Sequence, residues 1–240
     1  MIGIRSGLFF IVFVVGIVVF GILISALWPV TTLNFRRQLV CRWTDYNRLC
    51  LALICGLRDN IVGLENLPAA PYVIMAKHQS AWETTVFQSI FSPIVYLMKK
   101  SLQYIPVFGW ALMATEQIFI DRSQGVRSLK KIMQDGRKQF DQGVSVIVFP
   151  EGTRTPYGEV GKYQVGGISL AMAAGVPIVP VAHNAGKFWQ PSSWLQRPGV
   201  IQVRIGTPIF TAGVDKKGRK ELLALVKQRI EGMVADIENS

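Results

Sequence analysis

The chain has 240 residues, half of them hydrophobic, and a formal net charge of +11. This length accommodates one domain with an accessory segment, and the hydrophobic content is high for a soluble enzyme but low for a transporter with many spans. The cationic excess indicates a polyanionic partner, and the apolar content favours anionic lipid over nucleic acid. The cysteines show no metal-ligand spacing and are odd in number, which argues against a disulfide framework; they are Cys41, Cys50 and Cys55.

Residues 7–28 form an uncharged and almost wholly apolar stretch. As a helix, this stretch is about 33 Å long, which is enough to cross the hydrocarbon core of a bilayer. A cleaved signal peptide is the alternative, but its apolar region is usually shorter and ends at a small-residue site. The Trp28-Pro29 continuation fits such a site poorly. The sequence therefore predicts an uncleaved transmembrane anchor.

Charges around this stretch predict its orientation. Arg5 precedes it, and three arginines follow it, namely Arg36, Arg37 and Arg42. The cationic side of a short anchor faces the cytoplasm, so we expect the rest of the chain on the cytoplasmic side of the inner membrane. Residues 39–57 are apolar but interrupted by charges. They favour an amphipathic helix lying at the interface, with a helix packed on the catalytic domain as the alternative. The predicted division is an anchor over residues 1–58 and a domain over residues 59–240.

After Gly63, short β-rich runs alternate with helical patterns. We expect strands at residues 72–75, 94–98, 117–120, 144–149, 177–182 and 200–205. Between and after them we expect helices ending near residue 91 and spanning residues 102–114, 126–140, 168–174 and 219–237. This alternation predicts an α/β domain with helices on both faces of the sheet.

His78 stands directly after the first predicted strand, five residues before Glu83. Loops that leave a strand commonly hold catalytic side chains. The run from Ser80 to Glu83 fits a capping box, with Ser80 at the N-cap and Glu83 at the third helical position. Capping alone would explain Glu83. In the functional interpretation, Glu83 orients the imidazole of His78 and favours its protonated form during base catalysis.

Two further clusters follow predicted strands. The run from Phe149 to Thr155 follows the clearest strand, and its Gly152 permits close backbone approach, while Thr153 and Arg154 offer donors to a phosphate. A polar turn is the structural alternative. Arg122 places a cation at the end of another strand, where a surface salt bridge would also explain it. For the second histidine, His183, we predict a packed structural role.

Four blocks stand in order along the chain: His78-Gln-Ser-Ala-Trp-Glu83, Phe119-Ile-Asp-Arg122, Phe149-Pro-Glu-Gly-Thr-Arg154 and Val176-Pro-Ile-Val-Pro180. Together they resemble the four motifs of the glycerolipid acyltransferases, specifically the 1-acylglycerol-3-phosphate acyltransferases. The resemblance covers roughly residues 60–210. The family's first motif normally has an aspartate where this chain has Glu83. The chain therefore differs from the family pattern in the geometry of this acid.

The resemblance implies a mixed β-sheet flanked by helices, with His78 as the base that takes a proton from the acceptor hydroxyl and Glu83 as the residue that orients it. It also implies a binding site for the phosphate of the acceptor. The residues assigned to that site are Lys99 (preferred over Lys100), Arg122, Glu151, Gly152, Thr153 and Arg154. The reaction needs no metal and no cofactor, because acyl-CoA or acyl-carrier protein supplies the acyl group. Lysophosphatidic acid is the favoured acceptor, and another lysolipid, such as a lyso-aminolipid, is the alternative.

Two other classes of protein fit the sequence less well. A serine hydrolase or thioesterase would show G-x-S-x-G between a strand and a helix, whereas Gly167-Ile-Ser-Leu-Ala171 lacks the last glycine and lies within a predicted helix. A non-enzymatic lipid-binding anchor would not need a histidine and an acid beside phosphate-binding cations. The sequence therefore predicts a membrane-bound O-acyltransferase of phospholipid biosynthesis.

Overall fold

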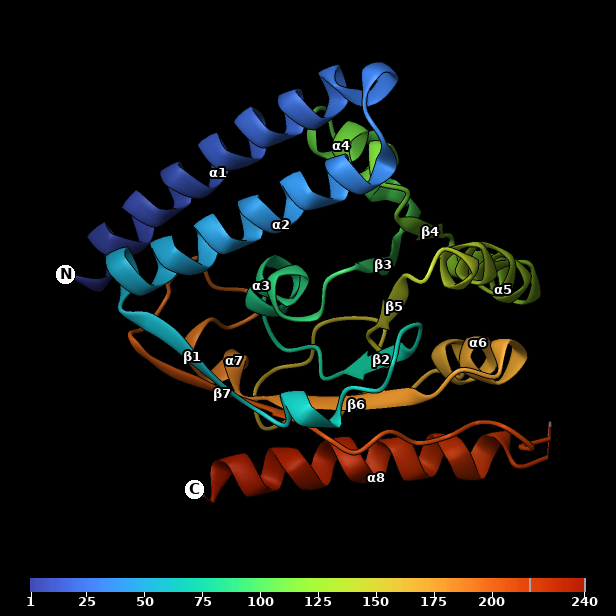
Figure 1. Ribbon diagram of the computed structural model, residues 1–240. Coiled ribbons are helices and arrows are strands. Elements are labelled where there is room, and N and C mark those ends of the chain that lie inside the picture. Colours follow the sequence, from blue (N-terminus) through green and yellow to red (C-terminus); the bar gives the residue numbers. More distant parts are fainter. Residues whose placement is uncertain (216, 240) are drawn as a thin grey trace.

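The computed structural model describes residues 1–215 and 217–239, with the side chain of Arg122 also outside the description (Figure 1). Seven strands form one sheet in the order β1-β7-β6-β2-β5-β3-β4. Their bounds are β1 Leu57–Val62, β2 Val73–Ala76, β3 Ile94–Lys99, β4 Ile118–Ile120, β5 Ser145–Val148, β6 Ile178–His183 and β7 Gly199–Ile205. Neighbouring strands are parallel except β6 and β7, which are antiparallel. The predicted mixed sheet is confirmed.

Helices cover both faces of this sheet (Figure 1). They are α1 Ile2–Ala26, α2 Leu33–Cys50, α3 Trp82–Phe91, α4 Phe108–Ala114, α5 Val126–Asp141, α6 Gly166–Ala174, α7 Ala185–Phe188 and α8 Arg219–Glu238. Side chains alternate along β2, since Ile74 packs in the core under α3 whereas Val73 and Met75 pack in the core with α5, α6 and α8. Both faces of the central strands are therefore buried, as expected for parallel strands between helical layers.

Helix α1 lies beside α2 and extends along the domain rather than away from it (Figure 1). Of the helices described, it is the one long and apolar enough to cross a membrane, judged by length and composition. Its first turns are tied to the domain, because the Ser6 hydroxyl accepts a hydrogen bond from the Gln196 amide at 2.9 Å. Phe9 is 1 % exposed and packs edge-on against the ring of Trp189. Helix α1 thus belongs both to the apolar surface and to the core.

Helix α2 is joined to the domain by two buried arginines. The Arg36 guanidinium donates to the carbonyl of Ala114, the last residue of α4, at 2.7 Å. The Arg37 guanidinium donates to the side-chain oxygen of Gln139 in α5 at 2.6 Å. Both arginines entered the prediction of membrane orientation, yet they bind protein groups instead of facing solvent or lipid headgroups. The side of the membrane therefore stays a prediction.

Strand β1 is an element that the sequence analysis did not predict. It begins at Leu57, where the predicted interfacial helix ended, after a short π-helical segment over Leu51–Cys55. Gly56 separates the two with a positive φ of 67°, a conformation that suits glycine and turns the chain out of the helix. The segment at residues 39–57 is therefore mostly the second half of α2, which packs against α3.

Candidate active site

The loops that follow the parallel strands meet at one edge of the sheet, where ligands of α/β proteins bind. His78 follows β2 after one residue, and residues 149–154 follow β5. Backbone hydrogen bonds join the two loops, because the Thr155 amide donates to the His78 carbonyl at 2.8 Å. The first and third blocks of the sequence therefore form one surface.

His78 and Glu83 form a hydrogen-bonded pair. His78 Nδ1 lies 2.9 Å from Glu83 Oε1, and the same oxygen accepts the backbone amides of Gln79 at 2.9 Å and Ser80 at 2.8 Å. Helix α3 begins at Trp82, and the Ser80 hydroxyl accepts the Trp82 amide at 3.1 Å. The N-cap of α3 is thus Ala81, one residue after the predicted Ser80, and the Ser80 hydroxyl bonds Trp82 rather than Glu83, so the predicted capping box forms in one direction only. Glu83 holds both the loop and the edge of the imidazole.

The environment of Glu83 keeps its carboxylate ionised. Glu83 is fully buried. Burial by itself would raise the pKa of Glu83, but the hydrogen bonds that it accepts from His78 and from the Ser80 amide hold this pKa below its ordinary value. A carboxylate only accepts hydrogen bonds, so the proton of the pair is on His78 Nδ1 in the neutral ring. Nε2 is then the ring atom that can take a proton from a substrate.

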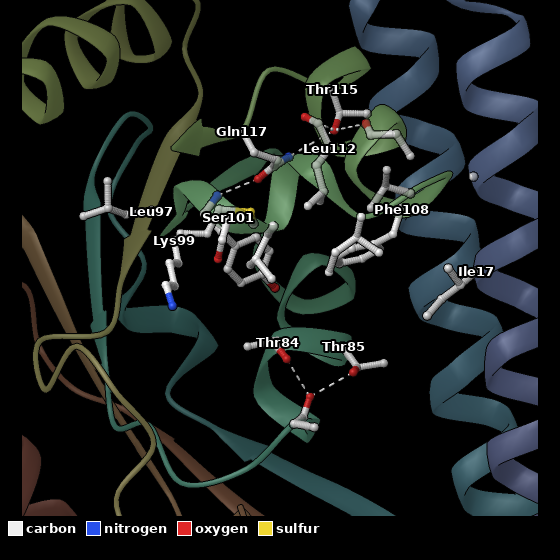
Figure 2. Close-up of a pocket in the computed structure, with 18 of the residues that line it drawn as sticks. Ile17, Thr84, Thr85, Leu97, Lys99, Ser101, Phe108, Leu112, Thr115 and Gln117 are labelled. Carbon is white, nitrogen blue, oxygen red and sulfur yellow. Dashed lines mark hydrogen bonds between the residues drawn. The ribbon is translucent and has the colours of Figure 1, made fainter. Parts of the chain in front are cut away.

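A cavity of about 1530 Å³ opens beside His78. Its apolar wall comes from α1, α2, β3 and α4, and the α1 residues that line it are Phe13, Ile17, Val18, Phe20, Gly21 and Ile24. Figure 2 shows Ile17, Lys99 and Phe108 around this space. It also shows the Thr84 and Thr85 hydroxyls, which donate to the carbonyl of Ala81, the residue before α3. A cavity this large and mainly apolar accommodates a long hydrocarbon chain.

Cations line the same cavity as His78. They are Lys99 and Lys100 at the end of β3 and Arg154 in the loop after β5, and Gly152 and Thr153 also line it. Both Lys99 and Arg154 are exposed, and within the described chain neither forms a salt bridge. The structure therefore brings four residues of the predicted phosphate site into the cavity that the predicted base also lines. Arg122 begins a short helical turn after β4, but its side chain lies outside the described residues.

Glu151 occupies a different position from the other residues assigned to the phosphate. It is 5 % exposed and lies behind the loop. Its Oε2 accepts the His78 amide at 2.8 Å, while its Oε1 lies 2.8 Å from the Lys77 ammonium and accepts the Thr155 hydroxyl at 3.0 Å. A carboxylate repels a phosphate, and these contacts instead stabilise the backbone on which His78 stands.

His183 lies behind the pair without reaching the cavity. It is fully buried, its Nε2 lies 2.9 Å from the carbonyl of Lys77, and its Nδ1 accepts the Ala185 amide at 3.2 Å. An Nδ1 that accepts a hydrogen bond requires the tautomer with the proton on Nε2. Burial lowers the pKa of His183, although Glu83 opposes the shift. The ring is therefore neutral.

Two features of the site escaped the sequence analysis. Phe149 stacks on the ring of His78, and α1 with α2 supplies the apolar wall of the cavity. Phe149 ends an apolar run, so its sequence context indicates only a strand. The α1 residues that line the cavity have the apolar pattern of a membrane segment. This pattern does not indicate that they also line a cavity.

Comparisons with known proteins agree with this geometry. Residues 58–184 match the family model Acyltransferase. The 1-acyl-sn-glycerol-3-phosphate acyltransferase of Pseudomonas aeruginosa is 38 % identical over 97 % of this chain and 90 % of its own length. The enzyme of the same description from Saccharomyces cerevisiae is 31 % identical over 78 % of this chain and 63 % of its own.

A solved structure shares the whole fold. The crystal structure of the 1-acyl-sn-glycerophosphate acyltransferase PlsC from Thermotoga maritima covers 100 % of this chain and 97 % of that chain, with a TM-score of 0.82 and 22 % identity. This likeness concerns the fold, and the sequence matches establish the relationship. The chain belongs to the 1-acyl-sn-glycerol-3-phosphate acyltransferase family.

Proposed function

We propose that the chain transfers an acyl group from acyl-CoA or acyl-carrier protein to the sn-2 hydroxyl of 1-acyl-glycerol-3-phosphate, giving phosphatidic acid for phospholipid biosynthesis. The observation that carries this proposal is the His78–Glu83 pair beside a cavity that has an apolar wall and a cationic wall. A lipid with a long chain and a phosphate complements both walls, since its chain is apolar and its phosphate is anionic.

His78 acts as the general base. Its Nε2 takes the proton of the sn-2 hydroxyl while the hydroxyl oxygen forms a bond to the thioester carbonyl carbon. The tetrahedral intermediate then collapses, the carbon–sulfur bond breaks, and the leaving thiolate takes the proton from the imidazolium. The ionised Glu83 stabilises the imidazolium between these steps because it lies 2.9 Å from Nδ1. No covalent acyl-enzyme is needed.

The phosphate of the acceptor binds the cations of the cavity. Lys99 and Arg154 form no salt bridge with described residues, so an anion between them would neutralise charge that the protein leaves uncompensated. Thr153 adds a hydroxyl donor on the same wall. Arg122 is included on the strength of the family resemblance.

The protein works at a membrane, to which the single apolar helix α1 attaches it. We place residues 1–58 as the attachment segment and the sheet domain on the cytoplasmic face of the inner membrane. Several α1 residues line the cavity, so an acyl chain bound there lies against the segment that contacts lipid. Both substrates of the reaction are lipids or carry a lipid chain, which agrees with this placement.

An acyl-transfer assay on the purified full-length chain tests the function. Labelled acyl thioester is offered with lysophosphatidic acid, lysophosphatidylcholine, a lyso-aminolipid or no acceptor. We expect labelled phosphatidic acid, and a loss of roughly 10²–10⁴ in rate for His78→Ala. Free fatty acid as the main product would identify a thioesterase instead, and ester formed only with another lysolipid would replace the acceptor.

A further inference from the structure

Lys77 and His78 point to opposite faces of the sheet. Along β2, Ile74 and Ala76 face the core under α3, whereas Met75 faces the core with α8. If the alternation continues, the His78 ring points toward α3, where it contacts Glu83. The Lys77 side chain points toward α8, where it contacts Glu231. Lys77 is 0 % exposed. A long cationic side chain is rarely so deeply buried unless paired charges hold it there.

The Lys77 ammonium lies between two carboxylates from distant parts of the chain. It is 2.8 Å from Glu151 Oε1 and 2.9 Å from Glu231 Oε1, and it donates to the Glu159 carbonyl at 3.0 Å. Glu231 belongs to α8, where its side chain is 20 % exposed and accepts the Tyr163 hydroxyl at 2.8 Å. Two acids around one buried base hold the ammonium from two sides, so loss of Glu231 leaves Lys77 paired with Glu151 alone and removes the contact that joins it to α8.

The network ends on the backbone of the catalytic histidine. Glu151 uses one oxygen for Lys77 and the other for the His78 amide, at 2.8 Å. The sequence of contacts therefore runs from Glu231 through Lys77 and Glu151 to His78. Glu231 lies outside residues 58–184, which match the family model, and it does not line the cavity.

We propose that Glu231 is a positioning residue for acyl transfer: it fixes the Lys77 ammonium, which fixes Glu151, which holds the backbone of His78 at the distance that catalysis requires. The inference rests on the proposed function. It gives α8 a role beyond packing. Helix α8 is also anchored by buried apolar residues, which the Glu231 variants leave unchanged; they are Leu222, Val226, Ile230 and Ile237.

Three variants test this role. Glu231→Ala removes both the charge and the oxygens that hold Lys77. Glu231→Gln keeps an oxygen for Lys77 and Tyr163 without the charge. Glu221→Ala is the matched control, because Glu221 is exposed on the first turn of the same helix. For Glu231→Ala we expect kcat per folded molecule to fall roughly tenfold or more, as for a slight misplacement of a catalytic group. We expect the KM of both substrates to change less than about twofold, because Glu231 does not touch the cavity, and Glu231→Gln to recover part of kcat.

Nuclear magnetic resonance of the imidazole nitrogens separates positioning from simple destabilisation. The chain has two histidines, so ¹⁵N-labelled imidazole gives signals from two rings. We expect Glu231→Ala to move the His78 signals while the protein stays folded, and Glu221→Ala to leave them in place. The signal intensities also give the folded fraction by which kcat is corrected.

Each outcome decides the inference. A reduced kcat at unchanged KM, with moved His78 signals and partial recovery in Glu231→Gln, supports it. Unchanged kcat per folded molecule and unmoved signals in both Glu231 variants overturn it, as does a loss of activity that only follows the unfolded fraction. If Glu231→Ala fails to fold, the same criteria apply to Glu231→Gln. A wild-type chain without transferase activity would instead refute the proposed function, and the His78 signals would still test the contact sequence.

Discussion

The rings of His78 and Phe149 stack face to face, with centroids 4.1 Å apart and 12° between their planes. Glu83 holds the edge of the imidazole through Nδ1, whereas Phe149 covers its face. Two contacts at right angles restrict both rotation and tilt of the ring. Phe149 also begins the loop that contains Arg154, so the residue that covers the imidazole and a cation of the cavity lie on one loop.

Replacing Phe149 by leucine should lower kcat roughly ten- to hundredfold, because the imidazole gains freedom to leave the productive orientation. Phe149→Tyr keeps an aromatic face and should retain most of the activity. Steady-state kinetics of both variants measures the difference. Equal rates for the leucine and tyrosine variants would show that stacking has no part in catalysis.

Glu83→Gln should lose most of the activity, whereas Glu83→Asp should retain a measurable part. Glutamine can still accept the backbone amides that Glu83 accepts but lacks the charge that stabilises the imidazolium. Aspartate keeps the charge and is the acid usual in the family. Turnover by the two variants is compared at equal folded fraction. If glutamine performs as well as glutamate, the carboxylate only caps the loop.

Arg154→Ala should raise the KM for lysophosphatidic acid and leave the KM for the thioester almost unchanged. A lost charge-assisted hydrogen bond costs about 1.5–3 kcal/mol, or roughly ten- to hundredfold in affinity. Preference over lysophosphatidylcholine, which lacks a monoester phosphate, should shrink in the same variant. A rise in the thioester KM with unaltered acceptor preference would place Arg154 at the acyl donor.

Buried His183 should make the protein less stable in mild acid. Its pKa is lowered in the folded chain from the ordinary value of 6.5. Below about pH 6.5 the unfolded chain therefore binds a proton that the folded chain does not, and stability falls as pH falls. His183→Gln should weaken this dependence, so the difference in Tm between pH 7.5 and 5.5 should be smaller than in the wild type. Identical differences would mean that His183 is protonated alike in both states.

The exposed face of α1 should hold the protein on the membrane. Ile11, Val15 and Ile22 are each more than half exposed and share one side of the helix, and none of them lines the cavity. Lysine at all three should release much of the protein on carbonate extraction, because each charge costs about 2.5–3.5 kcal/mol in the hydrocarbon core. Leu225→Lys on α8 is the control and should stay bound. Complete retention of the triple variant would assign attachment to α2, where Phe35 and Leu49 are exposed, and to the π-helical segment after it, where Leu53 is exposed.

Sequence patterns predicted the parts of this protein that depend on near neighbours. Buried runs indicated the central strands, with β5 at Ser145–Val148 against the predicted residues 144–149. The His78–Glu83 pair lies within one loop and helix start, so spacing sufficed to suggest it. Strand β1 was missed because it is an edge strand with alternating exposure, and its polar positions resemble the end of an amphipathic helix.

Features that join distant segments could not be predicted. The contact of Lys77 with Glu231 spans more than half of the chain, and no periodicity signals that a buried lysine follows a strand. The family resemblance assigns Glu151 to the phosphate together with Gly152 and Arg154. Adjacent residues of a tight loop point in different directions, however, and Glu151 faces Lys77 and the His78 amide instead. The use of α1 as a cavity wall was equally hidden, because a membrane face and a core face have the same apolar composition.

The pairing of β1 with β7 has a consequence for how the protein is made. The two strands are parallel neighbours yet lie roughly 140 residues apart, which is a costly loop to close. During synthesis, β1 leaves the ribosome early and has no partner until residues near 205 emerge. Helix α1 likewise cannot pack on the domain until Trp189, the partner of its Phe9, has been synthesised. We therefore expect the apolar helix α1 to reach the lipid surface before the sheet can close, so that the cavity it lines is completed there.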